Sequence, residues 1–91
     1  MIFFVSGFPG YCVDSHGQDQ NAGVRHLGGV YEGGEDCLSA CRQEEGASGC
    51  EYQATGKCYM HTADVATGSG EDDGYTCYVL QQTGGHLFRT L

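Results

Sequence analysis

The chain has 91 residues, including 16 glycines, six cysteines and no tryptophan, and its formal net charge is −8 at pH 7. The apolar core of a domain of this size gives only marginal stability, because it buries little surface. Covalent cross-links are therefore expected. The charge argues against nucleic acid and polyanionic glycans as partners, because a phosphate binder needs clustered basic residues. No segment approaches the ~20 apolar residues of a membrane span.

Both ends of the chain are apolar. A free soluble domain would not leave such segments loose in water. We therefore expect an N-terminal arm over residues 1–9 and a C-terminal arm over 81–91, flanking one domain over 10–80. Each arm would be tied down as an extra strand of its own sheet or against a neighbouring chain. The residues expected to carry any assembly are Phe3, Phe4 and Phe88.

The first strand and the helix follow in chain order. Val24–Tyr31 (VRHLGGVY) predicts a strand whose glycine pair forms a bulge or a close approach. Glu35–Glu45 is the one good helix candidate. Its first two residues are acidic and suit a helix N-terminus, and Gly46 is placed to end it.

The second half of the chain reads as strands. CEYQA and KCYMHT flank Thr55–Gly56, which predicts a hairpin, and YTCYVLQ follows the polar loop GSGEDDG as a further strand. Short strands joined by glycine turns around a single helix indicate an α+β fold rather than a helical bundle.

An even number of cysteines in a short chain indicates a disulfide framework, and hence a secreted, extracellular protein. Cys37 and Cys41 share one face of the expected helix, and one cysteine lies on each arm of the hairpin. Six cysteines allow fifteen pairings, which the sequence leaves open. A zinc site is disfavoured because no CxxC knuckle is present, and the same absence disfavours thioredoxin-like redox chemistry.

The cysteine neighbourhoods resemble those of the PAN/apple domain family. The shared features are a first cysteine after an aromatic residue, a helical CxxxC, then GCEYQ, CYMHT and a closing TCY, together covering roughly residues 10–78. The resemblance implies one helix packed on a curved antiparallel sheet. It also implies nested disulfide bonds, which here would join Cys12 to Cys77, Cys37 to Cys58 and Cys41 to Cys50.

Three groups of residues are candidates for a metal or ligand site. The loop GSGEDDG lacks the alternating ligands of an EF-hand and is expected to be a solvated turn rather than a Ca²⁺ site. The six tyrosines could form a sugar-stacking platform, but half-buried strand packing is the commoner role. The histidines, with no HxxxH pair, are expected at surface or strand positions: His16, His26, His61 and His86.

The functional expectation has two classes. PAN/apple-like modules serve non-catalytic recognition and adhesion, so the resemblance implies a module that binds an extracellular protein or glycan, with no enzymatic activity, metal or cofactor. No hydrolase triad or P-loop signature points elsewhere. The alternative is a self-assembling subunit of an extracellular fibre or matrix, joined through its apolar arms as a homo-oligomer or polymer.

Overall fold

A computed structural model describes residues 2–19, 23–71 and 74–83. These residues form one helix and seven strands, which makes the domain α+β, as the sequence predicts. In chain order the elements are β1 (Ile2–Pro9), β2 (Cys12–Val13), β3 (Val24–Leu27), α1 (Gly34–Cys41), β4 (Gly49–Gln53), β5 (Lys57–His61), β6 (Thr67–Gly68) and β7 (Tyr75–Thr83).

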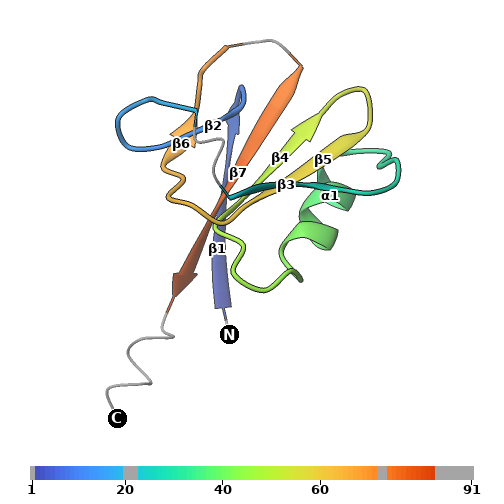
Figure 1. Cartoon of the computed structure of the whole chain (residues 1–91), viewed down its shortest axis with the longest axis horizontal. Coiled ribbons are helices and arrows are strands. Elements are labelled where there is room, and N and C mark those ends of the chain that lie inside the picture. The colour runs from blue at the N-terminus through green and yellow to red at the C-terminus, as the bar shows by residue number, and fades with distance from the viewer. Residues whose placement is uncertain (1, 20–22, 72–73, 84–91) are drawn as a thin grey trace.

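The main sheet has five antiparallel strands in the order β1-β7-β4-β5-β3, and β2 pairs with β6 in a separate two-stranded ribbon. The strands of the main sheet run between α1 and this β2–β6 ribbon (Figure 1). Successive side chains of a strand point to opposite faces. On β4, Cys50 is bonded to the helix whereas Glu51 contacts β2, so the sheet has a helix side and a ribbon side.

Each side of the sheet has its own apolar core. The helix side contains four of the cysteines with Leu27, Met60 and Leu80, and half-buried residues such as Val5 pack against them. The ribbon side is smaller and consists of Cys12, Cys77, Val65 and Val79, with Phe8 packed against it. Every cysteine is at most 1% exposed, so the disulfide bonds form the centres of both cores.

The expected hairpin is confirmed as β4 and β5, and the closing strand as β7. Two boundaries differ from expectation. The first predicted strand ends at Leu27, because Gly29 takes a positive φ of 98° and turns the chain out of the sheet instead of forming a bulge within it.

The helix also ends earlier than the predicted Glu45, at Cys41. Beyond Cys41 the backbone forms tight turns, in which Glu44 N–H donates to Cys41 C=O and Ala47 N–H donates to Glu44 C=O. The chain needs these turns because β4 begins at Gly49, and Cys50 must come back to bond Cys41. A helix continued to Glu45 would carry the chain away from its partner strand.

The N-terminal segment is an edge strand of the main sheet. Ile2 pairs with Thr83 and Pro9 pairs with Thr76, in an unbroken antiparallel register. Of the two arrangements expected for this arm, the structure therefore shows a strand on its own sheet. The side chains of Phe3 and Phe4 lie outside the described part of the structure, as do Phe88 and the rest of residues 84–91.

We predict that Gly68→Ala lowers the free energy of unfolding by about 1–3 kcal/mol. A Cβ at Gly68 would collide with the carbonyl oxygen of Pro9 and lie 2.9 Å from Phe8 Cβ, so β6 would be forced away from β1. Gly28→Ala is the matched control, because a Cβ there meets nothing within 4 Å. Urea unfolding should leave the control within about 0.5 kcal/mol of the parent. Equal stability of both variants would mean that β1 does not pack on β6.

Candidate functional site

All six cysteines form disulfide bonds. Cys12 bonds Cys77, Cys37 bonds Cys58, and Cys41 bonds Cys50, with Cα–Cα distances of 5.0, 5.4 and 5.9 Å. These are the same three pairs that the family resemblance implies. Cys37 and Cys41 are the buried residues of α1, so the helix is bonded to both strands of the hairpin through one face.

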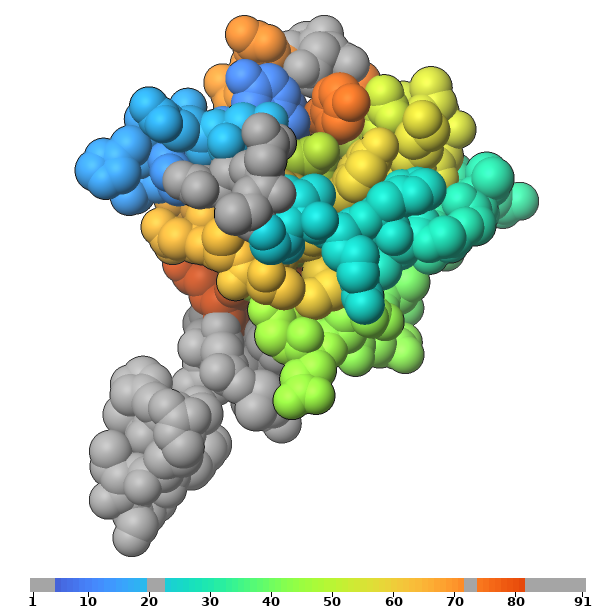
Figure 2. Space-filling model, viewed as in Figure 1, coloured from blue at the N-terminus to red at the C-terminus, as the bar shows by residue number. Residues whose placement is uncertain are grey.

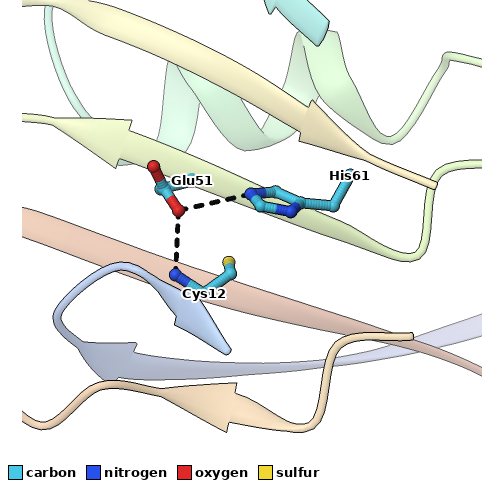
Figure 3. A group of neighbouring side chains, drawn as sticks. All are labelled: Cys12, Glu51 and His61. Atoms are coloured by element: carbon cyan, nitrogen blue, oxygen red, sulfur yellow. Dashed lines mark hydrogen bonds and ion pairs between the residues drawn. The ribbon is translucent and has the colours of Figure 1, made fainter. Parts of the chain in front are cut away.

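A buried polar cluster lies on the ribbon side of the hairpin. Glu51 of β4 and His61 of β5 are only 8% and 2% exposed. Glu51 Oε1 accepts the N–H of Cys12 at 2.8 Å and lies 3.2 Å from His61 Nε2 (Figure 3). One carboxylate oxygen thus joins the first residue of β2 to two strands of the main sheet.

The histidine ring has one unsatisfied atom. A carboxylate only accepts hydrogen bonds, so His61 Nε2 must be the donor to Glu51. His61 Nδ1 is buried and has no hydrogen-bond partner among the described residues. Such an atom carries a desolvation cost, which the rest of the cluster and the surrounding core must offset.

The ligand atoms of Cys12, Glu51 and His61 lie within 4.8 Å of one another, a spacing that could suit a metal ion. However, Cys12 Sγ is bonded to Cys77, and zinc takes the thiolate as its sulfur ligand. The oxidised cluster therefore offers a metal only one carboxylate and one imidazole. Its geometry fits a structural role, in which Glu51 satisfies the buried N–H of Cys12 and holds β2 against the sheet.

The three described histidines occupy surface or strand positions, as the sequence predicts. His16 is exposed in a loop, His26 is exposed on β3, and His61 is a strand residue of β5, whereas His86 lies outside the described residues. The pairing of His61 with Glu51 was not predicted from the sequence. The available signal was the hairpin itself, because Glu51 faces Tyr59 across the ladder, and His61 is two residues further along the same face.

The six tyrosines do not gather on one platform. Tyr31, Tyr52 and Tyr78 pack against the helix-side core. Tyr11 and Tyr75 meet edge to face with ring centroids 6.4 Å apart, and Tyr59 packs against His26 at 5.1 Å. All six tyrosines are half-buried, as expected for side chains that pack on strands rather than form a sugar-binding platform.

The ionisation of the Tyr78 hydroxyl is shifted by its surroundings. Burial raises the pKa of its hydroxyl above the ordinary 10.0, and the Glu35 carboxylate and the Tyr52 hydroxyl raise this pKa further. The folded chain therefore favours the neutral phenol. This contribution to stability is complete below pH 10.0 and is lost as the pH rises through the folded-state pKa.

The loop GSGEDDG is described only in part. Glu71 is exposed and its N–H donates to Ser69 Oγ at 3.3 Å, whereas Asp72 and Asp73 lie outside the described residues. In the same described ranges, no helix has the length and the apolar character needed to cross a membrane.

Comparison with known proteins gives no relative: no family model matches the chain, and neither a curated protein nor a solved structure is detectably similar to it. The resemblance to PAN/apple domains therefore depends on the cysteine neighbourhoods, and the fold described above is compatible with it.

We predict that Glu51→Ala lowers the free energy of unfolding by about 1–3 kcal/mol, because Cys12 N–H and His61 Nε2 both lose their acceptor. Glu51→Gln should recover most of this loss, since an amide oxygen can accept both bonds. Glu45→Ala, at an exposed position after the helix, is the control for removing one negative charge. A Glu51→Ala variant that unfolds in urea at the same midpoint as Glu45→Ala would contradict the structural role of the cluster.

Proposed function

We propose that the chain is a secreted, non-catalytic recognition module of the PAN/apple-like kind, which binds an extracellular protein or carbohydrate and serves adhesion. Three disulfide bonds in so short a chain are typical of extracellular proteins. The family resemblance supports the rest of the proposal, and the single helix across an antiparallel sheet is compatible with it.

A binding surface for such a module needs exposed side chains on a rigid support. The helix covers one face of the hairpin and the β2–β6 ribbon packs on the other, which leaves β3 and the segment after it at the sheet's second edge. This segment lies across the face of the molecule turned to the viewer (teal in Figure 2).

The observation that carries the proposal is the ring pair on this edge. His26 is exposed, and its ring lies tilted against the ring of Tyr59, with centroids 5.1 Å apart. The strand of Tyr59 is fixed to the helix through the neighbouring Cys58. Val30, in the segment after β3, is 84% exposed, and it is the one large hydrophobic side chain so exposed among the described side chains, which exclude those of residues 2–4. Rings on a fixed strand and an exposed valine suit the apolar face of a sugar or a protein side chain.

The test is a binding assay with neutral glycans and extracellular matrix proteins immobilised on a sensor. We expect His26→Ala, which lies at an exposed position, to weaken binding of the selected ligand roughly tenfold or more. Tyr11→Ala removes a half-buried ring from the other aromatic pair and should bind as the parent does. Reduced and alkylated protein should not bind.

Two outcomes would count against this proposal. If His26→Ala binds as the parent does and Tyr11→Ala binds more weakly, the ligand binds at the Tyr11–Tyr75 pair instead. Binding that survives reduction and alkylation would show that the folded surface is not recognised at all.

Self-assembly through the terminal segments is the second proposal. It is supported by the place of β1 at the edge of the main sheet, where a neighbouring chain could add a strand. Phe3 and Phe4 belong to this strand, and Phe88 would contribute from the C-terminal segment.

A further inference from the structure

The β1 edge of the sheet carries no charge. The chain has 12 acidic and four basic residues, yet none of them falls among the eight residues of β1 or the nine of β7. Two copies of a chain with a net charge of −8 repel each other over most of their surfaces. At the β1 edge of the main sheet, a second copy therefore meets no fixed charge on the edge strand or on the strand next to it.

The hydrogen bonds fix which backbone groups of β1 point away from the sheet. In an antiparallel pair, the N–H and C=O of alternate residues face the partner strand. Gly10 N–H donates to Tyr75 C=O, so Gly10 faces β7, and the alternation makes Ser6 and Phe8 do the same. Phe3, Val5, Gly7 and Pro9 therefore present their backbone groups outward.

Two further bonds agree with this assignment. Pro9 C=O accepts the N–H of Gly70 from outside the main sheet, as an outward group should. Leu80 N–H donates to Ser48 C=O, so even-numbered residues of β7 face β4 and the odd-numbered ones face β1. Within the described residues, no strand pairs with the outer edge of β1, where Phe3, Val5 and Gly7 each present one donor and one acceptor.

We propose that this edge binds a second copy of the chain, with the two β1 strands antiparallel about a two-fold axis at Val5. This register sets Val5 opposite Val5 of the partner subunit and Phe3 opposite Gly7 of the partner subunit. Every outward N–H and C=O of the three residues then pairs, giving six hydrogen bonds across the axis. The two five-stranded sheets join into one continuous sheet of ten strands.

The proposed contact is a symmetric two-fold contact, so it produces a dimer and cannot extend into a fibre. The same strand serves both subunits, so the dimer contact covers both β1 edges, and among the described strands of the main sheet β3 then forms the two outer edges. β3 has four residues, and two of them are Arg25 and His26, which are both exposed. Arg25 is ion-paired with Glu44, and a short edge strand that carries such a charged side chain resists further strand addition. The inference narrows the assembly proposal to β1, without a contribution from Phe88, and names a discrete dimer instead of a fibre. It does not depend on the recognition proposal.

The decisive variant is Gly7→Pro. The N–H of Gly7 points outward, so proline removes a donor of the dimer contact without removing a β1–β7 bond, and its ring blocks the approach of another strand. Gly7 is exposed with no positive φ, and a Cβ there lies at an ordinary 3.6 Å from the Tyr78 ring, so the fold can accommodate the change.

His26→Pro is the matched control at the opposite edge. Thr62 N–H donates to Gly23 C=O, so Gly23, Arg25 and Leu27 face β5, and the N–H of His26 points outward. The control therefore removes one outward donor from an exposed edge position, as Gly7→Pro does, but on a strand outside the proposed contact.

Sedimentation velocity over ~1 μM to ~1 mM should show the parent and His26→Pro at twice the monomer mass of 9.7 kDa. Gly7→Pro should stay monomeric over the same range, with circular dichroism and disulfide content unchanged. Removal of residues 84–91 should leave the dimer intact.

Three results would overturn the proposed dimer. The first is a parent that stays monomeric at the highest concentration. The second is a folded Gly7→Pro variant that remains dimeric, and the third is loss of the dimer on removing residues 84–91, which would place the contact on the C-terminal segment. If assembly persists in the Gly7→Pro variant, the broader assembly proposal survives with another surface.

Discussion

The fold depends on the attachment of α1 to the β4–β5 hairpin by two disulfide bonds. A helix of eight residues is too short to be stable alone in water, and no side chain caps its N-terminus. Cys37 and Cys41 lie one turn apart on its buried face and bond to β5 and β4 respectively. Two bonds from successive turns fix both the position and the rotation of the helix, which a single bond could not do.

Strand β4 carries this constraint through to the other side of the sheet. Cys50 points to the helix, and the next residue, Glu51, points to the ribbon side, where it accepts the N–H of Cys12. Cys12 is in turn bonded to Cys77 of β7. On the helix side, the Cys41–Cys50 bond ties β4 to α1. On the ribbon side, the Glu51–Cys12 hydrogen bond and the Cys12–Cys77 disulfide bond tie β2 to the sheet. Neither core therefore depends on apolar burial alone.

Much of this architecture could be predicted because it follows from local signals. The alternation around Thr55–Gly56 specifies the hairpin, and the four-residue spacing of Cys37 and Cys41 places both on one helix face. The helix end could not be predicted, since the turn after Cys41 follows from the need to return to Cys50. The burial of Glu51 and His61 could not be predicted either. Strand periodicity indicates which face of the sheet a side chain lies on, but not which segment covers that face. Their cover comes from Cys12, 39 residues away from Glu51.

Disulfide mapping of the unreduced protein tests this account most directly. Chymotryptic cleavage after Leu38 and Tyr52 separates the two helix cysteines from each other and the two hairpin cysteines from each other, so mass spectrometry can assign every bond. The account predicts Cys37 linked to Cys58, Cys41 linked to Cys50, Cys12 linked to Cys77, and no free thiol. A bond between Cys37 and Cys41, or an exchange of the two hairpin partners, would contradict it.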